Sequence, residues 1–68
     1  MNKFGERLKE LRCELKISQQ KMAKDFNTTA ATISRWENSI QEPNIDTIIA
    51  LALYLNSTTD YLLGKTDY

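Results

Sequence analysis

Small and polar side chains dominate the segment NTTAATISRWE, residues 27–37. The pattern is that of a short helix, because Ile33 and Trp36 lie three residues apart and share one side. The other side carries small side chains and one guanidinium group, that of Arg35. A helix face with so little bulk is either an ordinary solvated surface or a surface that lies close against another molecule.

This chain offers few of the side chains that zinc sites and nucleophilic catalysis use. It has no histidine and a single cysteine, Cys13, which excludes an internal disulfide and the usual zinc sites. No Gly-rich phosphate loop is present, and no candidate base lies near Cys13 in the sequence. We therefore expect no enzyme, no catalytic residue, no metal and no small-molecule cofactor. The longest apolar run, Ile48 to Leu55, is too short to cross a bilayer, so no membrane partner is expected. The absence of a secretion signal and the lone cysteine favour a cytoplasmic location.

The charges of the chain are divided unevenly, although the formal net charge is zero. Residues 1–26 contain seven Lys or Arg and four acidic residues, a net charge of +3. Residues 27–68 contain two basic and five acidic residues, a net charge of −3. A neutral chain divided in this way can still present a basic face to an anionic partner.

The hydrophobic pattern predicts a single all-α domain over residues 1–68. No segment alternates polar and apolar residues as a strand does. Helices are expected at about residues 2–15, 18–26, 29–38, 45–55 and 58–63. Their predicted N-caps are Asn2, Ser18, Thr29, Asn44 and Ser57, the last in a capping box with Asp60. Gly64 can close the last helix in a left-handed conformation.

Two of these helices have clear core faces. In the first, an apolar stripe runs along one side through Phe4, Leu8, Leu11 and Leu15. The fourth helix is apolar on nearly every side, which predicts a central, buried helix.

The second and third helices are joined by a turn of about three residues, and Ala23 supplies the small side chain where they cross. This arrangement predicts a helix-turn-helix unit, whose second helix can enter a DNA major groove. The sequence here resembles the Cro and lambda-repressor-like regulators, the XRE family. The matching text is SQQKMAKDFNTTAATISRWEN, then Pro43, IDTIIALALYL and STTDYLLG. The resemblance runs from about Phe4 to Gly64, and the order and spacing of these motifs make it specific.

The resemblance implies a compact five-helix domain that binds a near-palindromic double-stranded DNA operator as a homodimer and controls transcription. By this resemblance, the outward residues of the third helix are the candidates for reading DNA bases: Thr29, Ala30, Ala31, Ser34 and Arg35. Small side chains would let this helix sit deep in the groove, where Arg35 could bond guanine and the alanines could touch thymine methyl groups. Candidates for phosphate contacts are Gln19, Arg12, Lys21, Asn38, Ser39 and Gln41. A plain exposed face remains the alternative reading of the same residues.

An ion pair between Arg12 and Glu37 is also implied by the resemblance, so Glu37 is expected to be structural rather than DNA-binding. The family often has glycine where this chain has Lys16, Asn27 and Ser39. Such positions tend to need a positive φ, which Asn tolerates better than Lys or Ser. We therefore predict that Ser39→Gly stabilises the domain.

The loop NSIQEP, residues 38–43, contains Glu42 and no basic residue. Relatives often carry Lys or Arg there, so weaker phosphate binding is expected from this chain. The acidic loop and the zero net charge leave a second function open, that of a protein-interaction module such as an antitoxin-like domain. The sequence alone does not decide whether the chain is complete or the N-terminal domain of a longer regulator.

Overall fold

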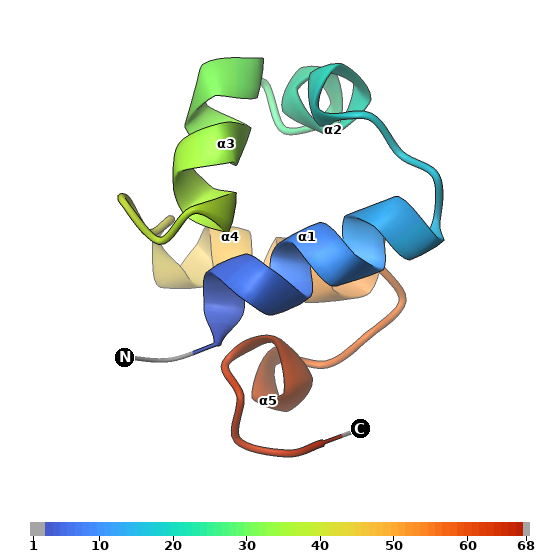
Figure 1. The fold of residues 1–68 in the computed structure, drawn as a ribbon, viewed down its shortest axis with the longest axis vertical. Helices are drawn as coiled ribbons and strands as arrows, with labels where there is room; N and C mark the ends of the chain where they lie inside the picture. The colour runs from blue at the N-terminus through green and yellow to red at the C-terminus, as the bar shows by residue number, and fades with distance from the viewer. Residues whose placement is uncertain (1–2, 68) are drawn as a thin grey trace.

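Residues 3–67 are described by a computed structural model, in which they form five helices and no strand (Figure 1). The helices are α1 (Phe4–Glu14), α2 (Gln19–Asp25), α3 (Ala30–Glu37), α4 (Ile45–Tyr54) and α5 (Thr59–Leu62). Each corresponds to a predicted helix, with the cap residues outside the hydrogen-bonded segment. The helices α2 and α3 lie together at one end of the molecule, α1 crosses in front of α4, and α5 lies at the opposite end (Figure 1).

Four helices begin at a side-chain cap. The hydroxyl groups of Ser18 and Thr29 and the amide oxygen of Asn44 each accept a bond from the backbone N–H three residues later, as predicted. The prediction for α5 was wrong by one residue, because Thr58 rather than Ser57 caps it. Helix α1 begins after Lys3, without a side-chain cap bond, and the predicted cap Asn2 lies outside the described residues.

Four helices are followed by a non-glycine residue in the left-handed conformation. The predicted positive φ is confirmed at Lys16 (58°), Asn27 (55°) and Ser39 (60°). Asn56 has φ of 56°, which the sequence reading did not anticipate. Gly64 has φ of 81°, as expected for a glycine that ends a helix.

The core lies between all five helices. Its buried apolar residues are Phe4, Leu8, Met22, Ala23, Ile33, Trp36, Leu51, Ala52, Leu55 and Leu62. The predicted stripe of α1 reaches the core through Phe4, Leu8 and the half-buried Leu11, whereas Leu15 is exposed. The prediction of a central, buried α4 was wrong: Leu51 and Ala52 are its buried residues, and the rest of its circumference is half-buried or exposed.

A buried arginine ties the C-terminal segment to α1. Arg7 donates through Nη1 to the carbonyl oxygens of Tyr61, at 2.7 Å, and of Thr66. Its guanidinium carbon lies 4.2 Å from the centre of the Tyr61 ring, and the Tyr61 hydroxyl bonds to Glu10. The bond to Glu10 is the main cause that raises the pKa of Tyr61 above its ordinary value. These contacts hold α5 against α1 and leave α2 and α3 at the other end.

Candidate nucleic-acid interface

The helix α3 divides into a buried side and an open side. Ile33, Trp36 and Glu37 are buried against the rest of the domain. The predicted base-reading residues lie elsewhere on its circumference: Thr29, Ala31 and Arg35 are exposed, and Ala30 and Ser34 are half-buried. The structure therefore brings the five candidates together on one accessible surface, whose largest side chain is that of Arg35.

Hydrogen bonds link the polar residues of this surface. Arg35 donates through Nη1 to the Thr32 hydroxyl at 3.4 Å, and that hydroxyl lies 3.1 Å from the Thr29 hydroxyl. Because a guanidinium can only donate, Thr32 accepts from Arg35, while either hydroxyl can donate in the contact between Thr32 and Thr29. Thr32 thus supports Arg35 from one turn away. The sequence reading missed this residue, although its position three residues before Arg35 was a usable signal.

A second network fixes α3 against α1 and α2. Glu37 accepts from Arg12 at 2.5 Å and 3.2 Å and from the Gln19 amide at 3.0 Å. The predicted ion pair is therefore present, and its side chains are 11% (Arg12) and 2% (Glu37) exposed. The hydrogen bond to Glu37 raises the pKa of Arg12, against the opposing effect of burial.

These contacts bear on two phosphate candidates. Arg12 also donates through Nη1 to the carbonyl oxygen of Ile17 at 2.7 Å, so all three of its guanidinium nitrogens bond to protein oxygens. Its charge is balanced inside the domain, and we assign it a supporting role. Gln19 uses its amide nitrogen for Glu37, which orients its side chain beside α3 and leaves the second N–H of that nitrogen for an external acceptor.

The remaining phosphate candidates lie on two other segments. Lys21 on α2 pairs with Asp25 at 3.0 Å, and Asp25 also accepts from the Tyr54 hydroxyl at 2.5 Å. The bond from Tyr54, followed by that from Lys21, lowers the pKa of Asp25. Asn38, Ser39 and Gln41 are exposed just after α3, where Asn38 donates to the Ser34 hydroxyl at 3.3 Å.

Tight backbone packing sets the position of α3 at both of its ends. Near its N-terminus, the Thr28 N–H donates to the Ala23 carbonyl at 2.8 Å across the turn, and Ala23 is buried as predicted for the crossing point. Near its C-terminus, Gly5 of α1 lies so close that a β-carbon there would be 2.6 Å from the Glu37 carbonyl oxygen. The open side of α3 thus belongs to a helix whose two ends are held by close backbone packing.

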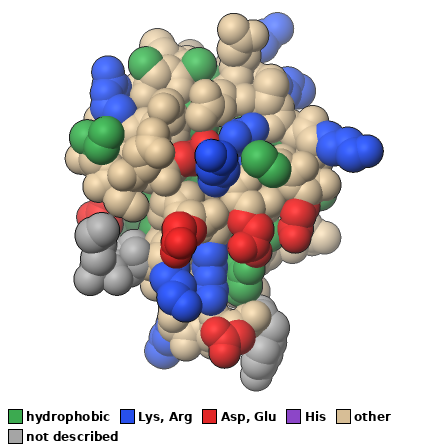
Figure 2. All heavy atoms as spheres, viewed as in Figure 1, with side chains coloured by type: hydrophobic (Ala, Val, Ile, Leu, Met, Phe, Trp, Pro, Cys, Tyr) green, Lys and Arg blue, Asp and Glu red, His purple; other side chains and the backbone are tan. Residues whose placement is uncertain are grey.

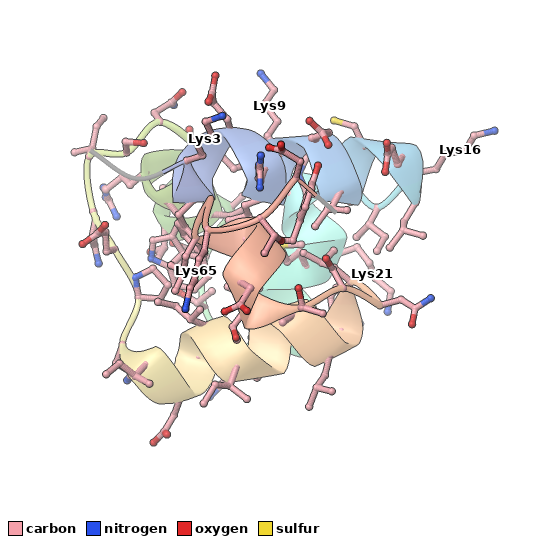
Figure 3. All side chains as sticks on the ribbon, turned by 90° about the horizontal axis from the view of Figure 1, so that it is seen from below. Lys3, Lys9, Lys16, Lys21 and Lys65 are labelled. Atoms are coloured by element: carbon pink, nitrogen blue, oxygen red, sulfur yellow. The ribbon has the colours of Figure 1, made fainter. Side chains whose placement is uncertain are left out.

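Charged side chains of both signs share the molecular surface. Figure 2 shows acidic and basic side chains interleaved on the face that it presents, rather than a single basic patch. Lys9 on α1 and Lys16 just after it project outward (Figure 3). Within residues 3–67 no group of three metal-ligating side chains gathers and no pocket is found. None of the five helices is long and apolar enough to span a membrane.

Residues 8–62 match the model of the helix-turn-helix family HTH_3. Over 60 residues the chain is 41% identical to repressor protein C2 of Salmonella phage P22, covering 88% of this chain and 28% of that protein. It is 36% identical over 64 residues to the HTH-type transcriptional regulator ImmR of Bacillus subtilis (strain 168), covering 94% of this chain and 50% of that protein. The chain thus spans half or less of the length of these two relatives.

The solved structures of the P22 c2 repressor have the same fold. The crystal structure of that repressor in complex with synthetic operator 9T in the presence of Tl+ superposes with a TM-score of 0.85 at 36% identity, covering 97% of this chain and all of that chain. The solution structure of its DNA-binding domain gives a TM-score of 0.81 at 39% identity over 94% of this chain and 87% of that chain.

Proposed function

This chain belongs to the helix-turn-helix family HTH_3, and we propose that it is a sequence-specific DNA-binding regulator of transcription. It binds a near-palindromic double-stranded operator as a homodimer, with α3 of each copy in the major groove. Such a protein acts in the cytoplasm, where its DNA is. The observation that carries the proposal is the open surface of α3, on a domain that matches an operator-bound repressor at a TM-score of 0.85.

The side chains of α3 supply base recognition in this proposal. Arg35 donates two parallel bonds to guanine O6 and N7, which is the commonest specific contact in the major groove. Its bond to Thr32 restricts the guanidinium before DNA arrives, so less side-chain freedom is lost on binding. Ala30 and Ala31 allow close approach and contact thymine methyl groups, while Thr29 and Ser34 bond bases or backbone.

Phosphate contacts surround this surface. Gln19, held beside α3 by Glu37, bonds one phosphate, and Asn38, Ser39 and Gln41 approach the strand from the segment after α3. These groups are uncharged, so few counterions are released when the protein binds. The dependence of affinity on salt is therefore shallow, at about one unit of slope for each cation that does reach a phosphate.

In-vitro selection with the purified protein on random duplexes of about 30 base pairs tests the proposal, because half-sites about one helical turn apart fit within that length. The expected result is enrichment of a two-fold symmetric motif containing guanine. The variant Arg35→Ala should lose about 5–150-fold in discrimination at that guanine, since one bidentate pair is worth about 1–3 kcal/mol.

The matched control is Lys9→Ala, which removes the same charge from the outer side of α1 (Figure 3). It should leave the selected motif unchanged. Failure of the wild-type protein to enrich any sequence at low salt would refute the proposed function, as would an equal loss of guanine preference in the two variants.

A further inference from the structure

The side chain of Arg35 is turned back toward the first turn of α3. Its Nη1 donates at 3.4 Å to the hydroxyl of Thr32, which is the third residue of that helix. Thr32 is half-buried, whereas Arg35 is exposed. Residues three apart in a helix differ in height by about 4.5 Å, so this bond directs the guanidinium toward the N-terminal half of α3.

Thr32 is itself held in place by the cap of the helix. The Thr29 hydroxyl accepts the backbone N–H of Thr32 at 3.2 Å, and the two hydroxyl groups lie 3.1 Å apart. A threonine in a helix divides between two side-chain rotamers, and the contact with Thr29 favours the rotamer that also meets Arg35. A long arginine side chain has far more rotamer freedom than a threonine. Thr32 is therefore the fixed member of the pair, and Arg35 is the restrained one.

Two kinds of DNA group compete for an arginine at this position. Guanine requires two parallel bonds in a defined orientation and carries sequence information. A phosphate attracts a guanidinium from many directions and carries no sequence information. Asn38, an exposed residue of the proposed phosphate-binding segment, follows Arg35 by three residues, so the two lie on neighbouring parts of the helix surface. An unrestrained Arg35 can therefore bind phosphate beside Asn38 as readily as guanine.

We propose that Thr32 determines which of these groups Arg35 contacts. It is a positioning residue that directs the guanidinium to guanine in the major groove and away from the phosphate backbone. Thr32 takes a single N–H of Nη1, which leaves the other nitrogens of the guanidinium for the two parallel bonds to guanine. The inference rests on the proposed function, because it concerns the same surface of α3.

The length of the bond sets the size of the effect. A hydrogen bond changes an equilibrium by about 2–10-fold in net terms, and this is the expected shift of Arg35 from guanine to phosphate when the Thr32 hydroxyl is removed. Each arginine that moves onto a phosphate adds about one unit to the dependence of affinity on salt. Because one DNA contact replaces another, total affinity should change less than discrimination at the guanine.

Thr32→Val tests the proposal, and Thr32→Ser and Thr47→Val are its controls. Valine keeps the shape of the side chain and the backbone N–H that Thr29 caps, but it lacks the hydroxyl. Serine keeps the hydroxyl. Thr47 occupies the same position in α4: it is the third residue of that helix, is half-buried, and has its backbone N–H capped at 2.8 Å by Asn44. Circular dichroism checks that all three variants fold.

The affinities of these variants are measured for the selected operator and for duplexes in which its guanine is replaced, at several salt concentrations. Thr32→Val should lose about 2–10-fold in discrimination at the guanine, with a salt slope steeper by about one unit. Thr32→Ser and Thr47→Val should match the wild type. In an Arg35→Ala background, Thr32→Val should change neither quantity, because Thr32 acts through Arg35.

Nitrogen relaxation of the Arg35 Nε group in the free proteins supplies a readout that does not depend on DNA. Its order parameter should be lower in Thr32→Val than in Thr32→Ser, and equal values would overturn the inference. Equal discrimination by Thr32→Val and Thr47→Val would overturn it as well and leave the DNA-binding function standing. A loss that persists in the Arg35→Ala background would show that Thr32 contacts DNA itself, contrary to a positioning role. A wild-type protein that enriches no sequence would refute the function and this inference together.

Discussion

Substitution of Gly5 by alanine tests how closely α1 and α3 are packed. Gly5 is the second residue of α1, and a β-carbon at this position would lie 2.6 Å from the Glu37 carbonyl oxygen. It would also lie 2.7 Å from the Ser39 hydroxyl and 2.8 Å from the Trp36 carbonyl oxygen. All three distances are shorter than real β-carbons show, and two of the atoms belong to the backbone of α3, which cannot rotate away. Alanine would therefore force the two helices apart.

The change in the free energy of unfolding expected for Gly5→Ala is opposite in sign to the change that helix propensity alone would give. Replacing a glycine by alanine in a helix stabilises it by about 1 kcal/mol when the site has room. Overpacking of a well-packed interface costs about 1–3 kcal/mol, and the upper part of that range applies because backbone atoms are involved. We expect Gly5→Ala to lower the free energy of unfolding by about 1–2 kcal/mol. This is a large fraction of the stability of so small a domain, roughly 3–10 kcal/mol at ordinary values per residue.

Urea denaturation followed by circular dichroism measures the effect. Glu6→Ala, at the neighbouring exposed position of the same helix, is the control for ordinary helix substitution and should stay within about 0.5 kcal/mol of the wild type. The double variant Gly5→Ala/Ser39→Gly removes the hydroxyl but neither carbonyl oxygen, so it should recover only the gain that Ser39→Gly gives alone. A stabilised Gly5→Ala protein, or full rescue in the double variant, would refute the reasoning.

Three further changes have effects that follow from local geometry. Ser39→Gly should raise the free energy of unfolding by about 0.5–1 kcal/mol, because a side chain at φ of 60° is strained; an unchanged urea midpoint would contradict this. Glu37→Gln should lower it by about 3–5 kcal/mol, because it leaves the charge of Arg12 uncompensated in a poorly exposed site; a loss below 1 kcal/mol by the same titration would show that the pair is not effectively buried. Tyr54→Phe should cost about 1 kcal/mol at neutral pH through loss of the bond to Asp25. Burial and that bond raise the pKa of Tyr54 from 10.0 to about 12, so its stabilising effect is complete below pH 10 and is lost as the pH rises through 12.

One control variant and one pH series accompany these changes. Lys21→Gln breaks the ion pair with Asp25, in which the Lys21 side chain is 62% exposed. Because the pair is exposed, the free energy of unfolding should fall by less than about 0.5 kcal/mol, in contrast to the larger loss expected for Glu37→Gln. For Tyr54, the difference in stability between wild type and Tyr54→Phe is followed from pH 9 to pH 12, a range chosen around the ordinary tyrosine pKa of about 10. A difference that stays constant across this range would contradict the raised pKa.

The sequence predicted local features of the fold better than burial. Caps and left-handed residues depend on a few neighbouring side chains, so Ser18, Thr29 and Asn44 could be recognised directly. The cap of α5 was misplaced because Ser57 and Thr58 are adjacent and equally able to accept the bond. The burial of a helix face, by contrast, depends on which other helices are present to cover it. Helix α4 looks like a buried helix, but a chain of 68 residues has too few other helices to surround it.

The contacts in the candidate site that follow from the helix-turn-helix motif were predicted. The contacts between residues far apart in the sequence were missed. The pair between Arg12 and Glu37 was expected, yet the contact of Gln19 with Glu37 was not. Arg7 of α1 is buried against α5 and the segment that follows it. It carried no local signal because the carbonyl groups that it bonds lie 54 and 59 residues away in the chain. Polar groups with partners that far apart in sequence can be assigned only after folding brings them together.

The two sides of α3 should have separable effects on DNA binding. On its inward side, Glu37 joins α3 to α1 and α2, so Glu37→Gln loosens the position of the whole helix. Its loss of affinity should be similar for all duplex sequences once the unfolded fraction is corrected for. On the outward side, Arg35→Ala leaves the helix in place and should change the ranking of sequences instead. Affinities of both variants for one set of single-base operator variants distinguish the cases. A changed ranking with Glu37→Gln would mean that this carboxylate takes part in base recognition, contrary to the structural role that its burial and its two hydrogen-bonding partners support.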